Sequence, residues 1–474
     1  MVNVKPFLCI SLAIPALMAC SACGTAHAQL GTSSMSYNAT AASASNVYGR
    51  RSGVRLPLPQ TIRIEEFINY HEHDIPRPDD EQDIRLSVQH VKIDDEETLV
   101  QIGISTPQQY DTETMPPLNL VLVIDQSGSM VSENRIGKVK NAIDALIDRF
   151  RKNDRIAIVG FSNKASVILD SCRKSNRQQI RDAIDSLCAE GSTNLHDGLQ
   201  TGYKIASEHL DPDRTNRVLF LTDGNANVGI TEPDAIAEMS RKYNRKGISL
   251  STIGVGGDFN QELLTTLADA GRGLAHFVGD QDDIEKIFVN DFESLLAPIA
   301  HDVRLKLDFG VPAEEVKIFG YSQADSDECD CDEDRHDADD DDIVLQLKNL
   351  NYGVTQVVMA TIPTTRNLDR IKATLLAEHA TKDRELKFQA RSEKATRAKS
   401  KSIKRDYAIA VLASGIKRAA KRAEDDDVSG ARRALTSAIR KAERQLDERK
   451  DENVSRVKKI AERYVEVFDC QLDR

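Results

Sequence analysis

The feature that most constrains the fold is a nearly continuous apolar run, Leu118–Ile124, which ends in the carboxylate of Asp125. A strand that lacks polar alternation is typical of a parallel sheet covered on both faces. Further strand-like segments follow at 156–161, 166–169, 217–221, 248–253 and 275–278, separated by helical patterns at 133–150, 176–187, 195–209, 233–245 and 260–270 and followed by one at 282–297. This alternation predicts an α/β fold with a doubly wound, mostly parallel sheet.

Period-two alternation of apolar residues appears on both sides of this unit, at 84–106 and again after residue 302. It predicts antiparallel strands, which form either two separate units or one sheet that the α/β unit interrupts. Apolar residues at helical spacing then predict C-terminal helices. The predicted division is a tether at 29–60, a short helix with strands at 61–112, the α/β unit at 116–298, a β-rich unit at 302–392 and a helical region at 402–470.

The N-terminus carries an export signal. Its apolar run, Phe7–Ala19, follows Lys5 and is too short to span a bilayer, but it suits a secretory signal peptide within residues 1–28. Cleavage before Cys20 would make that cysteine a lipidated N-terminus, and cleavage after Ala28 would leave no anchor. We therefore expect an exported protein of the periplasm or cell envelope, with membrane contact only through a lipid on Cys20.

Charge and composition exclude some partners. The net charge of −12 argues against nucleic-acid binding, which needs a basic face, and aromatic residues make up only 5% of the chain. The charge is unevenly spread, since residues 391–474 hold 23 Lys and Arg against 15 Asp and Glu. The two parts of the chain are therefore expected to present different surfaces to different partners.

Oxygen-bearing side chains follow two of the predicted parallel strands. Asp125, Ser127 and Ser129 come directly after the first strand, and Asp223 follows the strand at 217–221. Thr193 lies in a loop that opens a helix between them. Because ligands bind outside the carboxyl ends of parallel strands, we expect these side chains to converge there. Carboxylates and hydroxyls are hard donors that suit Mg²⁺, Mn²⁺ or Ca²⁺.

The alternative for the three hydroxyls is helix capping. Ser127, Ser129 and Thr193 all precede predicted helices, where a hydroxyl can accept a hydrogen bond from a free backbone N–H. Their combined placement favours the metal-site interpretation.

The pattern Asp125-x-Ser127-x-Ser129, with Thr193 and Asp223 downstream, resembles the metal-ion-dependent adhesion site of von Willebrand factor type A domains. The resemblance covers about 118–298. It implies that Ser127 and Ser129 ligate the metal directly, that Thr193 does so directly or through water, and that Asp125 and Asp223 hold ordered waters. The segment Ile64–Tyr70 also resembles one that precedes this domain in exported bacterial members of the family.

A cation held largely by neutral hydroxyls keeps much of its charge and attracts one more anionic oxygen. We therefore expect a non-enzymatic protein that binds the Asp or Glu carboxylate of a protein partner through Mg²⁺, with Mn²⁺ or Ca²⁺ as other candidates. The alternative is a structural accessory subunit of an envelope assembly that docks through its C-terminal helices. A hydrolase is disfavoured, because both carboxylates of the site are already used as water-holding ligands.

Three other features have less specific interpretations. Cys172 and Cys188 flank a predicted helix and are candidates for a disulfide. Residues 325–342 contain twelve acidic residues in eighteen and are expected to form a solvated loop, with weak Ca²⁺ binding as the alternative. The basic run 391–405 is expected to be a solvated linker.

Overall fold

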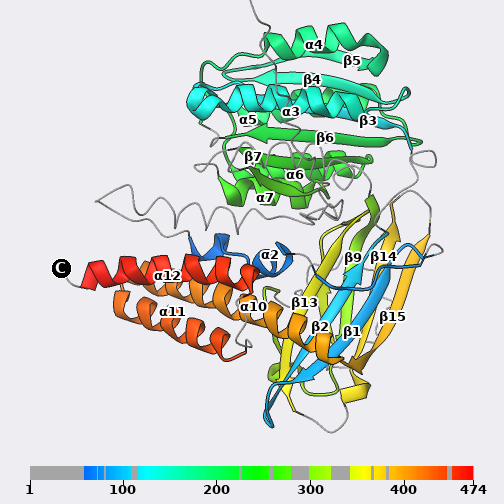
Figure 1. The fold of residues 1–474 in the computed structure, drawn as a ribbon. Helices are drawn as coiled ribbons and strands as arrows, with labels where there is room; N and C mark the ends of the chain where they lie inside the picture. The colour runs from blue at the N-terminus through cyan, green and yellow to red at the C-terminus, as the bar shows by residue number, and fades with distance from the viewer. Residues whose placement is uncertain are drawn as a thin grey trace, which may run out of the picture.

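The computed structural model describes residues 58–71, 73–79, 82–107, 116–223, 227–255, 260–278, 298–321, 342–364, 368–380, 384–445 and 451–472. The expected signal peptide with Cys20, most of the tether, the helix expected at 282–297 and nearly all of the acidic run lie outside these residues. Among the helices that are described, none combines the length and apolar character needed to cross a bilayer. Figure 1 shows a domain built on a wound sheet, a second β-sheet below it and a group of C-terminal helices beside that sheet.

The wound sheet confirms the predicted fold class. Its strands run in the order β5-β4-β3-β6-β7-β8, and every neighbouring pair is parallel except β4 with β5. All eight residues of β3 are buried, as its unbroken apolar run requires. The strands are β3 (Leu118–Asp125), β4 (Arg155–Phe161), β5 (Ala165–Arg173), β6 (Thr215–Thr222), β7 (Ile248–Val255) and β8 (Ala275–Val278).

Helices cover both faces of this sheet. One face packs on α3 and α4 through residues such as Ile143 and Ile180, and the other on α5, α6 and α7 through Leu199 and Leu264. Each apolar side chain buried in this way contributes about 1.5–3 kcal/mol. The helices are α3 (Arg135–Arg149), α4 (Arg177–Ser186), α5 (Leu195–Glu208), α6 (Pro233–Asn244) and α7 (Gln261–Ala270).

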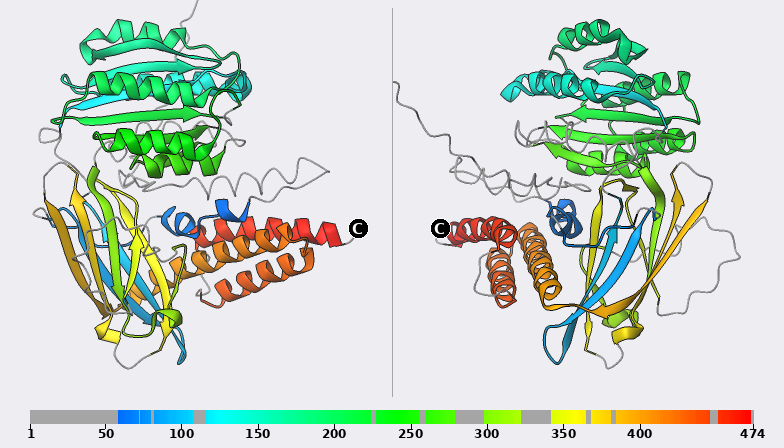
Figure 2. Two further views of the ribbon diagram at one scale, coloured as in Figure 1. Left: turned by 180° about the vertical axis from the view of Figure 1, so that it is seen from behind. Right: turned by 45° about the vertical axis from the view of Figure 1, so that its right-hand side comes forward.

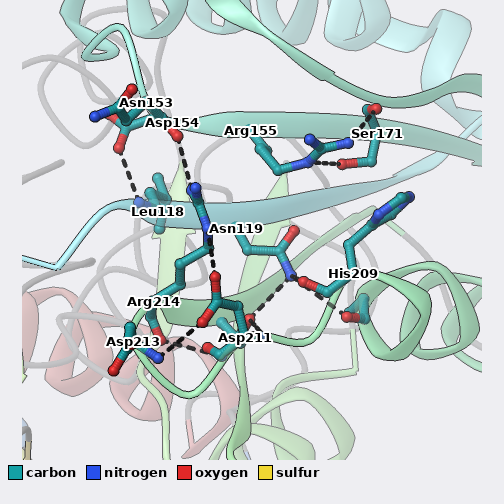
Figure 3. A network of polar contacts seen from close by, with 12 residues as sticks. Leu118, Asn119, Asn153, Asp154, Arg155, Ser171, His209, Asp211, Asp213 and Arg214 are labelled. Atoms are coloured by element: carbon teal, nitrogen blue, oxygen red, sulfur yellow. Dashed lines mark hydrogen bonds and ion pairs between the residues drawn. The ribbon is translucent and has the colours of Figure 1, made fainter.

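The amino ends of β3 and β6 are closed by a network of polar side chains (Figure 3). The Asn119 amide donates to the Asn216 side-chain oxygen at 3.0 Å and to the carbonyl of His209 at 3.0 Å. The Asp154 carboxylate accepts from the backbone N–H groups of Leu118 at 2.8 Å and Arg151 at 2.6 Å. These bonds tie the strand starts to the adjoining loops.

The second sheet joins strands that precede the wound-sheet domain in the sequence with strands that follow it. Its strands follow the order β10-β13-β2-β1-β15-β14-β9-β11, with β12 paired to β9. The wound-sheet domain is thus an insertion between β2 and β9, which resolves the alternative that the sequence leaves open. The strands are β1 (Arg85–Lys92), β2 (Glu97–Ser105), β9 (Pro298–Asp308), β10 (Lys317–Ile318), β11 (Ile343–Gln346), β12 (Leu350–Asn351), β13 (Thr355–Pro363), β14 (Lys372–His379) and β15 (Glu385–Lys394).

Three long helices lie beside this sheet (Figure 2). Helix α10 packs Ile403, Tyr407 and Val411 against the sheet, and its other side chains form a core with α2, α11 and α12. The helices are α10 (Arg397–Glu424), α11 (Val428–Glu443), α12 (Glu452–Leu472) and the short α2 (Ile64–Asn69), with 3₁₀ turns η2 (Pro59–Thr61), η4 (Lys174–Asn176), η6 (Ala313–Glu315) and η8 (Leu368–Arg370).

The structure corrects three expectations. The basic run 391–405 is no linker, because its first residues end β15 and α10 begins at Arg397. Strand β15 pairs in parallel with β1, with Ser392 opposite Val88, so the sheet is not wholly antiparallel. Cys172 and Cys188 are both free thiols, so the disulfide considered for them is absent.

Candidate metal centre

The predicted site residues lie where β3 and β6 end side by side. Ile124 pairs with Leu221, so Asp125 and the segment Thr222–Asp223 leave the sheet at neighbouring positions. In the sheet, β4 lies on one side of β3, and β6, which comes later in the sequence, lies on the other side. In α/β sheets, ligands bind outside the carboxyl ends of strands at such a switch in strand order.

Asp125 is fully buried and held by two hydrogen bonds. Its Oδ1 accepts from the backbone N–H of Ser127 at 2.8 Å, and its Oδ2 accepts from the hydroxyl of Thr222 at 2.5 Å. Burial raises the pKa of Asp125 to about 6, although both bonds act in the opposite direction. The carboxylate therefore shapes the turn after β3 while it remains a costly buried charge.

Three other predicted residues form a chain of hydrogen bonds. The hydroxyls of Ser127 and Ser129 lie 2.9 Å apart, and the Ser129 hydroxyl donates to Asp223 Oδ1 at 2.7 Å. Asp223 Oδ2 accepts from Arg135 Nη1 at 2.7 Å. Ser127 and Asp223 are buried and Ser129 is exposed, so the middle of this hydrogen-bonded series reaches the surface.

The capping interpretation of the hydroxyls is wrong. Ser127 precedes the 3₁₀ helix η3 (Gly128–Asn134), but its side chain makes no capping hydrogen bond. Ser129 lies within η3 and donates to Asp223 instead. At α5 the capping residue is Asn194, whose side chain accepts from the N–H of Asp197, and Thr193 precedes it. None of the three hydroxyls is therefore used as a helix cap.

Thr193 joins the cluster through the backbone of its loop. Gly191 accepts from the N–H of Gly128 at 3.0 Å, which binds this loop to the one that carries the two serines. Gly191 has a φ of 85°, a left-handed conformation that favours glycine. Thr193 is buried and its N–H donates to the Asn227 side chain at 2.8 Å, but its hydroxyl makes no hydrogen bond to the other four predicted residues.

Sequence reasoning missed three residues that hold the site together. Thr222 and Asn227 position Asp125 and Thr193, and Arg135 pairs with Asp223. Thr222 adjoins a predicted site residue, so its hydroxyl is a signal that could have been used. Arg135 lies 88 residues from Asp223 in the chain, and no local pattern connects the two.

The donor set fits a hard divalent cation. All five predicted side chains offer oxygen, three as neutral hydroxyls and two as carboxylates, and Ser129 bridges Ser127 to Asp223 within hydrogen-bond distance. In the described part of the chain, no group of three or more His, Cys, Asp or Glu side chains gathers as a metal site. Because three of its five donors are hydroxyls, the cluster suits a hard divalent cation that accepts uncharged oxygen ligands.

Two family models match the chain. Residues 119–290 match the von Willebrand factor type A domain, and residues 22–101 match a model described as von Willebrand factor. The protein YfbK of Escherichia coli strain K12, which is uncharacterised, is 32% identical over 280 residues, or 56% of this chain and 48% of YfbK. The match thus spans about half the length of that relative.

Solved structures of this type are also similar. The von Willebrand factor type A protein from Catenulispora acidiphila has a TM-score of 0.49 at 16% identity, covering 80% of this chain and 96% of that one. Proximal thread matrix protein 1 from the mussel byssus, with a zinc-occupied metal-ion-dependent adhesion site, has a TM-score of 0.32 at 26% identity, covering 38% of this chain and 46% of that one.

Proposed function

The chain is a von Willebrand factor type A domain protein, and from this premise we propose that it binds a carboxylate of a protein partner through a divalent cation, with Mg²⁺ as the first candidate. The domain is an interaction module in this proposal and performs no catalysis. The observation that carries it is the hydrogen-bonded chain from Ser127 through Ser129 to Asp223 at the switch point of the sheet.

The proposed roles follow from the positions of the side chains. The hydroxyls of Ser127, Ser129 and Thr193 would hold the cation, and Asp125 and Asp223 would orient water around it. When bound, the cation supplies a positive centre for an anionic oxygen of the partner. Asp125 also fixes the turn through Ser127 N–H, so the hydroxyls are arranged before any ligand arrives.

Cation binding by the purified chain tests this proposal directly. We expect Mn²⁺, followed by electron paramagnetic resonance, to bind at one site and to be displaced by Mg²⁺. Ser129→Ala should lower the Mn²⁺ affinity at least tenfold, because it removes the hydroxyl that links Ser127 to Asp223. Glutarate, a simple dicarboxylate probe, should then shift the signal of Mn²⁺ bound to the wild-type protein.

A matched serine at the opposite edge of the sheet serves as the control. Ser171 accepts a hydrogen bond from Arg155 at 2.9 Å, and Ser171→Ala should leave Mn²⁺ affinity unchanged. Equal affinity in the wild-type and Ser129→Ala proteins, or no Mn²⁺ binding at all, would overturn the proposal.

Export is part of the same proposal and rests on the apolar run Phe7–Ala19. We propose that the mature chain lies in the cell envelope, held by a lipid if processing occurs before Cys20. Fractionation of cells that carry Cys20→Ser tests the anchor. The variant should move from the membrane fraction to the soluble envelope fraction, and an unchanged distribution would exclude the lipid.

A second candidate function is docking through the C-terminal helices. It is favoured by a cavity of about 670 Å³ between α11 and the turn that joins β1 to β2. Five basic side chains line it: Arg432, Arg433, Arg440, Lys441 and Arg444. Figure 1 and Figure 2 place α11 on the side of the helices that faces away from the wound-sheet domain. An anionic protein partner fits this groove.

The charge of the groove is only partly balanced. Arg432 pairs with Asp469, and Lys441 lies 3.6 Å from Glu97. Among the described residues, Arg433, Arg440 and Arg444 form no ion pair with a carboxylate. Guanidinium groups along one helix face that pair with no described carboxylate are well suited to the carboxylates of an acidic segment.

Charge reversal separates the two candidates. Deletion of residues 402–474 would expose the sheet face that α10 covers, so it would test folding as well as docking. Replacement of Arg433, Arg440 and Arg444 by Glu leaves the buried faces intact. If docking through α11 dominates, this variant loses partner capture and Asp125→Ala retains it. If the metal centre dominates, the two variants behave the opposite way.

A further inference from the structure

Arg135 lies directly behind the proposed metal centre. It is the first residue of α3, and its backbone N–H bonds to the carbonyls of Met130 and Ser132 at the end of η3. The side chain is only 9% exposed, and its Nη1 donates to Asp223 Oδ2 at 2.7 Å. The guanidinium is therefore held against the oxygen of Asp223 that does not bond to Ser129.

Its hydrogen bonds alone do not explain why an arginine is buried here. A guanidinium has five donors, yet the described residues offer Nη1 an acceptor and leave the buried Nε without one. Burying a charge with unmet donors is expensive. What the side chain does supply is a permanent positive charge within hydrogen-bond distance of a carboxylate in the cluster.

The charge of Arg135 changes the net charge of the site when a cation is bound. The site holds two carboxylates: Asp223, which pairs with Arg135, and Asp125, which lies close enough to Asp223 for the two charges to interact. A divalent cation that joins them leaves one positive charge unbalanced, whereas without Arg135 the two carboxylates would neutralise the same cation completely. Because both carboxylates and the guanidinium are buried, these charges interact at a low effective dielectric.

We propose that Arg135 acts as a built-in counter-ion to Asp223. Its positive charge weakens binding of the divalent cation but keeps the loaded site positive enough to bind the partner's carboxylate. This inference rests on the proposed metal-dependent function. It assigns to Arg135 a tuning role that is distinct from holding the cation or touching the partner.

The obvious alternative is that Arg135 only orients Asp223. The two roles predict opposite signs for the same substitution. Loss of an orienting contact should weaken cation binding, because Asp223 would lose its position. Loss of a counter-ion should strengthen cation binding, because a competing positive charge has been removed.

The test compares Arg135→Gln, Arg135→Lys and wild-type protein by Mn²⁺ titration and by the shift that glutarate causes in the signal of bound Mn²⁺. We expect Arg135→Gln to bind Mn²⁺ about tenfold more tightly and glutarate several-fold more weakly. Arg135→Lys keeps the charge and should stay within about threefold of wild type in both. Arg214→Gln removes an arginine paired with Asp211 at the far edge of the same sheet and should change neither value.

The outcomes separate the two proposals. If wild-type protein binds no Mn²⁺, the proposed function fails. If wild-type protein binds Mn²⁺ and Arg135→Gln binds it equally or less tightly, only the counter-ion role fails. If Arg135→Gln folds only when a divalent cation is added, the Mg²⁺ concentration that restores folding is measured in place of the Mn²⁺ titration. The counter-ion role is supported if this Mg²⁺ concentration is lower than the one that saturates the wild-type site. A higher concentration overturns the role.

Discussion

Strand β3 carries a buried polar cluster at each of its ends, and the two clusters are bonded in different ways. At the amino end, Asn119 and Asp154 bond mainly to backbone groups, including the N–H of Leu118 and the carbonyl of His209 (Figure 3). At the carboxyl end, Ser129 bonds to the side chains of Ser127 and Asp223.

The difference separates a structural cluster from one that can accept a ligand. Backbone groups at the amino end cannot turn towards a ligand unless the loops that carry them unfold. A serine hydroxyl can rotate about one bond and exchange a neighbouring oxygen for a cation at small cost. Polar burial alone is therefore a poor sign of a binding site, and the identity of the bonding partners is a better one.

The largest expected effect is at the amino end. Asp154→Ala should lower the free energy of unfolding by about 3 kcal/mol, because the backbone N–H groups of Leu118 and Arg151 lose their buried acceptor. Urea unfolding measures this loss. Mn²⁺ affinity of the folded variant should match wild type, and a clear loss of affinity would show that the two ends are not independent.

A smaller effect of opposite sign is expected for Asp125→Asn without metal. The pKa of Asp125 is about 6 when folded and near 3.8 when unfolded, so the folded state holds its proton more tightly. Ionisation therefore costs stability as the pH rises through this window. In EDTA, the variant should be more stable than wild type by about 2 kcal/mol at pH 7.5.

The pH dependence supplies the control for that substitution. At pH 4, wild-type Asp125 is protonated in the folded state and about half ionised in the unfolded state, so most of the advantage of Asp125→Asn should disappear. Unfolding free energies in urea at pH 4 and pH 7.5 measure both values. A constant difference between the two proteins would show that the charge of Asp125 is not the cause.

The smallest effects on stability are expected for two serines. Ser129→Ala and Ser171→Ala should each change the free energy of unfolding by less than about 1 kcal/mol, because each removes a hydroxyl that is not fully enclosed. Thermal unfolding in EDTA measures this. Addition of Mg²⁺ should raise the melting temperature of Ser171→Ala but not of Ser129→Ala, and equal rises would contradict the contrast between the two edges.

Local patterns predict much of the wound sheet and most strands of the second sheet, but they do not fix how the strands of the second sheet pair. The apolar run that forms β3 marks a doubly covered strand wherever it occurs. The basic run 391–405 suggests a solvated linker, although its first residues end a strand. The end of β15 lies in the sheet because Arg391 pairs with Lys372 of β14 and Ser392 pairs with Val88 of β1, about three hundred residues away. The charged side chains of this segment are exposed.

The same limit applies to the site. The spacing of Asp125, Ser127 and Ser129 selects the residue types and places them after one strand. Whether the hydroxyls cap helices or bond to each other depends on Asp223, which another strand supplies.

The sequence by itself determined the succession of strands and helices along the chain in the wound-sheet domain. It also determined the oxygen donors at the edge of that sheet, because both depend on residues that are neighbours in the chain. Only the tertiary structure decided that the β1–β2 strands belong with β9–β15 and that Arg135 faces Asp223. The physical reason is that strand pairing and buried charge pairing are contacts between distant segments, and their energies arise only when those segments are packed together.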